Sequence, residues 1–376
     1  MFAVNDLILI NYTDRGNTKM FKQKHKAVLA EYEKFWERKN TDRAILNMAY
    51  TKPNTQAYRA PETLEEQWLD PEYNYAAFKR RDENSVYLAE GIPGYFTNLG
   101  PGCLSACLGG GFQLAKQTVW FDKEQFITDW ENPPAVKFDE QSEMWQYITK
   151  MQERFAADPD VCFSITDLGG IMDIVASLHG TENLLYDLYD YPDEVYNFTK
   201  EVRREMQVAY KKQVETICAL DLPFITWMNI PSEKPWYPMQ SDFSYMISPS
   251  QFEKFVLPEL VDQASYLERS VYHLDGIGEL PHLDMILDIP GLNGIQWNPG
   301  AGKEPLCDEK WFDIYRKIQD KGKNIILLWA LDERLEPQLE RFFKTFEPTG
   351  LYLSGNRFTS QAAAERMLEN VIKWSK

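Results

Sequence analysis

The sequence has few cysteines, and none of them forms a CxxC pair. The five are Cys103, Cys107, Cys162, Cys218 and Cys307. An odd number without paired spacing argues against a disulfide framework and a zinc ribbon, and it is typical of a reducing compartment. Cys103 and Cys107 have helical spacing, but no histidine follows at ligand spacing. We therefore expect a cytoplasmic protein whose cysteines bind no zinc.

An excess of positive charge is also missing. Lysine and arginine number 40 against 57 acidic residues, which gives a formal net charge of −17. Such a charge repels a phosphate backbone, so we expect no nucleic-acid partner. Long apolar runs are lacking too, because the segment LILI near the N-terminus is far shorter than the roughly twenty residues of a membrane helix. The sequence therefore predicts a soluble protein without a membrane partner.

Material for a buried core is plentiful. Hydrophobic residues make up 44% and aromatic residues 14% of the 376 positions. The hydrophobic fraction can fill a sizeable core, and the aromatic fraction exceeds what packing alone usually requires, so some rings are expected to line a ligand pocket. We expect a loosely attached leader over 1–19 and a single domain over 20–376, which opens with an amphipathic, strongly charged helix over 20–39.

Eight short apolar or β-branched runs recur along this domain, separated by helical stretches. They cover residues 44–50, 94–98, 161–167, 222–229, 270–276, 294–299, 324–330 and 350–356. Several runs are apolar up to a final polar residue, as in parallel strands buried on both faces. The alternation predicts an α/β fold, a (β/α)8 TIM barrel with an N-terminal helical extension. A doubly wound open sheet is the alternative, although no glycine-rich nucleotide fingerprint supports it.

Two further segments have clear local signals. The stretch over 99–160, after the second predicted strand, is expected to be an elaborated loop with a helix and a hairpin that acts as a lid. Ser248, followed by Pro249 and Gln251, predicts an N-terminal capping box at the start of a helix.

Polar residues at the ends of barrel strands normally form the active site. In VYHLDG, His273 and Asp275 are two positions apart, so their side chains share one face of the strand. They can orient each other, share a proton or bind a metal; a structural histidine held by a carboxylate is the alternative. With Asp242, in the loop after the fourth strand, they form the expected catalytic set.

A second group of residues is expected to bind substrate. Gln296 and Asn298 repeat the same spacing, and neutral amides suit a polar substrate, although capping of the turn before Pro299 is the alternative. The complete substrate-binding set is Asn98, Asp167, Trp227, Gln296, Asn298, Trp329, Asn356 and Arg357. Structural use is expected for His179, and solvated helical positions for His25 and His282.

The stretch WYPMQSDFSYMISPSQFEKFVLPELVDQASYLERSVYHLDG resembles the middle of uroporphyrinogen decarboxylase-like proteins, in which an aspartate precedes an SPxxFxxFxxP helix. YFTNLGPG, TVWFD and DIPGLNGIQWNPGAG resemble further segments of this superfamily, which includes corrinoid-dependent methyltransferases. The resemblance covers about residues 20–376 and implies a barrel enzyme. True uroporphyrinogen decarboxylases carry an arginine-rich motif after the first strand. Here that region reads MAYTKPNTQAYR, so decarboxylation of a tetrapyrrole is not expected.

The thiol-methylating branch of the superfamily carries His-x-Cys on the fifth strand and a further cysteine near the eighth, and these residues bind zinc. This chain keeps His273 but has Asp275 and Asn356 at the other two places. We therefore expect no zinc–thiolate site and, in general, no metal. A weaker alternative is a metal bound by His273 and Asp275, with Asp242 or Asp332 as a third ligand.

The resemblance implies three functions, in order of preference. The first is methyl transfer to or from a small polar substrate, with a corrinoid protein as partner or a tetrahydrofolate-type pterin as methyl carrier. In that scheme His273 and Asp275 are the acid–base pair, and Asp242 and Asp167 position the substrate. The second is a decarboxylase or lyase of a carboxylated small molecule. The third is a ligand-binding barrel without turnover. A homodimer is expected because superfamily members are often dimers.

Overall fold

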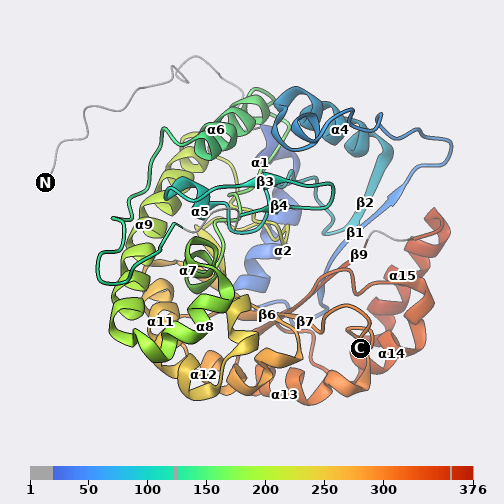
Figure 1. The fold of residues 1–376 in the computed structure, drawn as a ribbon. Coiled ribbons are helices and arrows are strands. Elements are labelled where there is room, and N and C mark those ends of the chain that lie inside the picture. Colours follow the sequence, from blue (N-terminus) through green and yellow to red (C-terminus); the bar gives the residue numbers. More distant parts are fainter. Residues whose placement is uncertain (1–19, 122–125, 356–357, 376) are drawn as a thin grey trace, which may run out of the picture.

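The computed structural model of the chain describes residues 20–121, 126–355 and 358–375 (Figure 1). The predicted leader over 1–19 and two expected substrate-binding residues, Asn356 and Arg357, lie outside the described residues. Among the described residues, no helix is both long and apolar enough to cross a membrane.

The central feature is a seven-stranded sheet in the order β2-β1-β9-β8-β7-β6-β5. Neighbouring strands are parallel except for the β1–β2 pair, which is antiparallel. The strands are β1 (Ile45–Thr51), β2 (Ser85–Ala89), β5 (Trp236–Gln240), β6 (Arg269–Asp275), β7 (Gly294–Asn298), β8 (Asn324–Leu327) and β9 (Leu351–Gly355). A separate hairpin consists of β3 (Gln113–Leu114) and β4 (Val119–Trp120).

Helices surround the strands as a ring in Figure 1. The α-helices are α1 (Met20–Lys24), α2 (Lys26–Trp36), α3 (Leu64–Leu69), α4 (Pro71–Asn84), α5 (Leu104–Cys107), α6 (Glu143–Ala156), α7 (Ile171–His179), α8 (Thr181–Asp190), α9 (Pro192–Ala219), α10 (Pro249–Gln251), α11 (Leu257–Tyr266), α12 (Leu283–Leu287), α13 (Phe312–Asp320), α14 (Glu336–Thr345) and α15 (Gln361–Trp374). Short 3₁₀ turns are η1 (Asp242–Met246), η3 (Ile277–His282), η4 (Glu309–Trp311) and η5 (Glu333–Leu335), and η2 (Phe252–Val256) is a π-helical turn.

The fold is α/β, as predicted, but the described residues do not form a closed barrel of eight strands. Five predicted runs are confirmed as β1, β6, β7, β8 and β9. The predictions of strands over 94–98, 161–167 and 222–229 were wrong. These runs form only isolated bridges, Tyr95 with Phe163 and Phe224 with Ser232.

Side chains replace the backbone ladder in these three runs. The backbone N–H of Thr97 donates to Ser164 Oγ at 2.9 Å, and that of Thr166 donates to Gln213 Oε1 at 3.3 Å. Further along, Asn229 has a φ of 51°, which ends the extended conformation. Hydrogen bonds from Ile165 N to Ile225 O (3.0 Å) and from Tyr95 N to Cys162 O (2.9 Å) still hold the segments side by side. They lie where further strands would close the sheet.

The paired strand in this region is β5, which the sequence prediction placed in a loop. Pro238 lies within β5 and cannot donate to a ladder, so it is a signal against a central strand. The position is tolerated because β5 is an edge of the sheet. Local predictions were better: Ser248 and Gln251 form the capping box, and the loop over 99–160 contains α5, the β3–β4 hairpin and α6.

The N-terminal helix α2 covers the amino ends of the strands. Trp36 packs against Trp236, the first residue of β5, with ring centroids 5.1 Å apart. Arg269, the first residue of β6, donates to both carboxylate oxygens of Glu33 at 2.8 and 2.6 Å. The carboxyl ends of the strands, on the opposite side of the sheet from α2, are where α/β proteins usually bind their ligands.

Candidate active site

Polar side chains form a row across the carboxyl ends of β5, β6 and β7. The strand register places Gln240 beside His273 and His273 beside Gln296. One step further, Asp275 lies beside Asn298. His273 and Asp275 of the HLD segment therefore lie opposite Gln296 and Asn298 of the QWN segment on the neighbouring strand. This is the edge at which α/β proteins bind their ligands.

Gln296 fixes the tautomer of His273. The amide Nε2 of Gln296 donates to the carbonyl of Trp297 at 3.0 Å, so the amide oxygen is the atom that faces the imidazole. Nδ1 of His273 therefore carries the hydrogen and donates to Gln296 Oε1. In the neutral ring, Nε2 then presents a lone pair, which can accept a proton or bind a cation.

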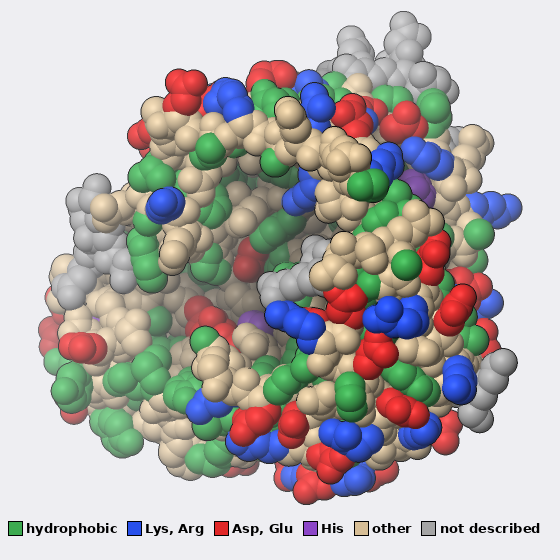
Figure 2. Space-filling model, turned by 90° about the vertical axis from the view of Figure 1, so that its right-hand side faces the viewer, with side chains coloured by type: hydrophobic (Ala, Val, Ile, Leu, Met, Phe, Trp, Pro, Cys, Tyr) green, Lys and Arg blue, Asp and Glu red, His purple; other side chains and the backbone are tan. Residues whose placement is uncertain are grey.

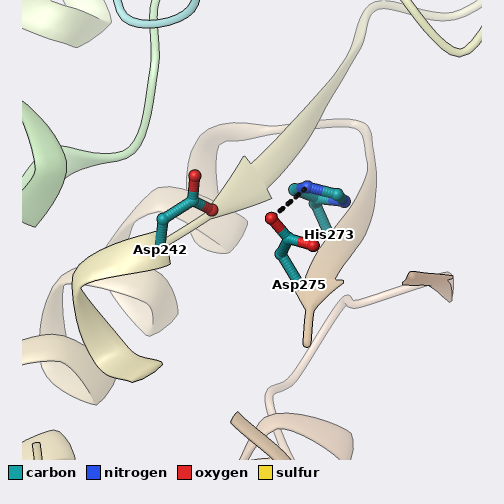
Figure 3. Close-up of side chains that lie close together, drawn as sticks. All are labelled: Asp242, His273 and Asp275. Carbon is teal, nitrogen blue, oxygen red and sulfur yellow. Dashed lines mark ion pairs between the residues drawn. The ribbon is translucent and has the colours of Figure 1, made fainter. Parts of the chain in front are cut away.

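Two carboxylates face this nitrogen. Asp275 Oδ2 lies 3.9 Å from His273 Nε2, and Asn298 Nδ2 holds the other oxygen of Asp275 at 2.6 Å. Asp242 begins η1, directly after β5, and its carboxylate points toward the same space (Figure 3). One ligand atom from each of the three residues lies within 4.8 Å of the other two. The predicted catalytic set is thus brought together from two neighbouring strands.

More carboxyl groups surround this centre. Asp173, in the first turn of α7, accepts the backbone N–H groups of Asp242 (3.1 Å) and Phe243 (2.8 Å). Burial and the charge of Asp242 raise the pKa of Asp173 well above its usual range. The pKa of Asp242 is also raised, by desolvation between the walls of the site, although His273 opposes this. Burial raises the pKa of Asp167 to about 6. Asp167 and Asp173 can therefore gain or lose a proton near neutral pH.

Glu279 is a fully buried carboxyl behind the site. Its Oε2 accepts the hydroxyl of Tyr272 at 3.0 Å, and its Oε1 has no hydrogen-bond partner among the described residues. Burial, followed by the charge of Asp242, raises its pKa to about 10. Glu279 is therefore neutral at physiological pH.

This pKa gives a prediction for stability. The folded pKa lies above the unfolded value, so Glu279 favours the folded state fully below about pH 4.5, and this contribution is lost as the pH rises toward 10. Glutamine does not ionise, so the variant Glu279→Gln is free of this loss of folding stability at high pH. We expect its midpoint of thermal unfolding to exceed that of the wild type by several degrees at about pH 9 and to match it near pH 5. Exposed Glu253→Gln is the control, and an equal shift at both pH values would contradict the assignment.

Two cavities flank the centre, and Figure 2 shows the hollowed face, with acidic side chains and a histidine inside. The first cavity, of about 330 Å³, lies at the ends of β1, β8 and β9 and is lined by Trp227, Asn229, Trp329 and Arg81, among others. The second, of about 340 Å³, is lined by Asp173, Asp242 and residues of the β3–β4 hairpin. Trp227 links the first cavity to the centre, because its ring meets that of His273 edge-on at 5.1 Å.

The other predicted residues have varied positions. Trp329 is 59% exposed at the first cavity. Asp167 is buried beside the centre, where its Oδ1 accepts the Gly169 N–H at 2.9 Å. Asn98 accepts the Gly100 N–H at 3.1 Å and so caps a turn. Gln296 and Asn298 orient His273 and Asp275.

Sequence reasoning missed Gln240, Asp173, Glu279 and Arg81. Gln240 was hidden by the misplaced strand, and Asp173 lies in the first turn of α7, outside the predicted run over 161–167. Glu279 had no distinguishing pattern. His282 was expected to be solvated and is instead fully buried, stacked on Phe252 at 4.4 Å, because η3 turns it inward.

Comparisons with known proteins add a fold relationship. A methyltransferase from Methanosarcina mazei has a similar structure, with a TM-score of 0.59 and 10% sequence identity, covering 92% of this chain and 98% of that chain. No protein-family profile and no curated protein sequence matches the chain. At this identity the likeness shows the fold alone, which is α/β in both proteins.

The donor set of the centre limits which cations it can hold. Asp242, His273 and Asp275 offer two carboxylates and one imidazole. Carboxylate-rich sites suit harder divalent cations, whereas thiolates select zinc. No cysteine belongs to this cluster of described residues. The centre also suits an organic cation, because its charge is negative and its wall is aromatic.

Proposed function

We propose that this protein is a methyltransferase that moves a methyl group between a small polar substrate and a corrinoid carried by a partner protein. The observation that carries the proposal is the convergence of Asp242, His273 and Asp275 beside two cavities at the carboxyl edge of the sheet. The methyltransferase-like fold supports it. We further infer that the strands of the main sheet and the three runs over 94–98, 161–167 and 222–229 together form a TIM-type barrel with an incomplete hydrogen-bond ladder.

The residues of the centre suit the proton balance of methyl transfer. The acceptor supplies the electron pair of the new bond to the methyl carbon, and the old bond leaves its pair on the donor heteroatom. A cobalt(I) corrinoid would supply the nucleophile. Where the donor heteroatom then needs a proton, protonated His273 Nε2 gives it, and Asp275 at 3.9 Å stabilises the imidazolium. In the reverse direction the same nitrogen takes the proton back.

The mouth of the hollow fits a docking partner. Five exposed large hydrophobic side chains lie on segments that border the cavities or follow the centre: Trp120, Tyr245, Met246, Ile277 and Trp329. Figure 2 shows hydrophobic side chains around the hollow. Exposed apolar side chains around a polar cleft are typical of protein interaction sites. A partner that carries a flat macrocycle can cover this rim and reach His273.

The alternatives have less support. A decarboxylase must hold a carboxylate at the reacting centre, but the acids around His273 repel one. A pterin carrier instead of a corrinoid is supported by the amides of Asn47 and Asn229 in the first cavity, where Asn229 Oδ1 has no partner among the described residues.

The decisive experiment mixes the purified protein with cobalt(I) cobalamin and a panel of methyl donors: methylated amines, aryl methyl ethers and methyl thioethers. Methyl transfer predicts donor-dependent loss of the cobalt(I) absorbance, faster with the protein than without it. A parallel mixture contains a methylated tetrahydropterin in place of the donors. Loss of cobalt(I) absorbance only in that mixture would favour the pterin alternative. No acceleration in any mixture would contradict methyl transfer to a corrinoid.

The donor set also gives a prediction for metal content. Because the centre has no thiolate, protein purified without chelators is expected to contain far less than one zinc per chain. Elemental analysis by mass spectrometry measures this, with a zinc-binding protein purified in parallel as the control. Near-stoichiometric zinc that Asp275→Asn removes would overturn the zinc-free assignment.

A further inference from the structure

The hollow, meaning the first cavity together with the centre that the Trp227–His273 contact joins to it, carries opposite charges at its two ends. The acidic end comprises Asp242 and Asp275, with Asp167 and Asp173 behind them. Within the described parts of the chain, none of the four forms an ion pair with a lysine or arginine; His273 is the one basic side chain paired with any of them. Asp167 is buried, Asp173 and Asp275 are half-buried and Asp242 is exposed; carboxylates that are buried even in part usually have a cationic partner. Here a ligand can supply it.

The wall of the acidic end is aromatic. Trp227 contacts the imidazole of His273, and its indole Nε1 is buried without a hydrogen-bond partner among the described residues. Trp329, with a φ of 57°, lies at the same cavity. Tryptophan faces next to carboxylates are the arrangement that recognises alkylated ammonium groups, which cannot satisfy several hydrogen-bond acceptors but are attracted to ring faces.

The other end of the hollow is cationic. Arg81, at the end of α4, lines the first cavity and also an adjoining cavity of about 600 Å³. Its guanidinium packs 5.5 Å from the Phe78 ring and has no carboxylate partner among the described residues. Arg59, the other arginine of the adjoining cavity, is already paired with Glu66. Arg81 is therefore the cation that can receive an anionic group, and a guanidinium matches a carboxylate well.

We infer that the substrate is a zwitterion, in which a methylated ammonium group at Asp242, Asp275 and Trp227 is joined by a short chain to a carboxylate at Arg81. This inference rests on the proposed function, since it names the methyl donor of the same site. A purely cationic ligand would leave Arg81 unpaired, and a purely anionic one would leave the acidic end unpaired. The first cavity, of about 330 Å³, has Arg81 and Trp227 in its lining, and the acidic end lies beyond Trp227, so the cavity itself has to hold only the chain and the carboxylate of the ligand.

Calorimetric titration of the wild-type protein tests the inference without any turnover. The probes are trimethylammonio carboxylates with one to four methylenes between nitrogen and carboxylate. Each has two matched analogues: the acid in which a tert-butyl group replaces trimethylammonio, and the alcohol in which a hydroxymethyl group replaces the carboxylate. At the best chain length we expect the zwitterion to bind at least about tenfold more tightly than both analogues. Equal affinity for either analogue, or no binding by any zwitterion, overturns the inference.

Variants assign the two ends separately. Arg81→Gln is expected to weaken the zwitterion about tenfold and to leave the alcohol unchanged, while Arg81→Lys retains part of the affinity. Asp275→Asn is expected to weaken the zwitterion and the alcohol and to leave the tert-butyl acid unchanged or tighter. Arg80→Gln, one position away and outside the lining of both cavities, is the matched control. Equal losses of the zwitterion in Arg80→Gln and Arg81→Gln contradict the role of Arg81.

The inference and the proposed function fail in different ways. If a zwitterion binds as expected but cobalt(I) is not methylated, the zwitterion-binding site stands, while the corrinoid proposal falls and with it the role of the zwitterion as a methyl donor to a corrinoid. If the protein methylates cobalt(I) from a neutral ether or thioether and binds no zwitterion, methyl transfer stands and the inference is overturned.

Discussion

With an aryl methyl ether as donor, whose leaving oxygen takes up a proton, His273→Ala is expected to slow methyl transfer about 10²- to 10⁴-fold, the usual contribution of a positioned acid–base group. The imidazole has a fixed tautomer, because its Nδ1–H donates to Gln296, and its Nε2 faces Asp275 and Asp242. The rate of cobalt(I) loss with this ether measures the effect; a trimethylammonio donor leaves as a neutral amine, so its rate is expected to depend much less on His273.

Two controls separate catalysis from folding. His25→Ala removes a half-buried histidine on the N-terminal helical segment, opposite the site, and is expected to keep the full rate. Free imidazole is expected to restore part of the rate of His273→Ala, because the variant leaves a hole beside the Trp227 ring. A rate for His273→Ala within about twofold of the wild type would remove His273 from the mechanism.

Arg269→Met is expected to cost about 3 kcal/mol of unfolding free energy, which is typical when one partner of a buried ion pair is removed. Arg269 is 5% exposed and donates to both oxygens of Glu33 and, at 2.8 Å, to Ser232 Oγ. These bonds attach α2 to the amino end of β6. Equilibrium urea unfolding with circular dichroism measures the change.

The double variant Glu33→Leu with Arg269→Met is expected to recover part of the loss, because it no longer leaves one charge unpaired. Lys344→Ala breaks an exposed pair with Glu340 and is the control, with an expected change below about 0.5 kcal/mol. A loss for Arg269→Met no larger than that of Lys344→Ala would show that α2 does not depend on this contact.

The sequence predicted those parts of the fold where hydrophobic pattern and pairing agree. The runs that became β6, β7 and β9 are apolar on both faces and end in polar residues, and their predicted bounds were nearly right. The runs over 94–98 and 161–167 have a similar apolar pattern. Some of their backbone N–H groups donate to the side chains of Ser164 and Gln213 instead of to a neighbouring backbone, so these runs form an isolated bridge and no continuous ladder. Periodicity reports burial and cannot report the bonding partner.

The same limit applies to the site. His273 and Asp275 were predictable because residues two apart on a strand must share a face. Gln296 and Asn298 were found by the same spacing, but the sequence could not show that they pair with His273 and Asp275, since this needs the β6–β7 register. Asp173 and Arg81 come from helices, where no local pattern separates a residue at a cavity from one on the surface.

The register of β6 and β7 pairs His273 with Gln296 and Asp275 with Asn298. These four side chains therefore depend on one another and have to be changed together. Each amide forms a hydrogen bond with one ionisable group, so replacing His273 or Asp275 alone leaves the amide of Gln296 or Asn298 without that partner. Efforts to retarget the chemistry should therefore randomise the two strand ends together. Arg269, which holds Glu33 of α2, lies at the amino end of β6, away from the randomised positions. Such a library therefore leaves the attachment of α2 unchanged.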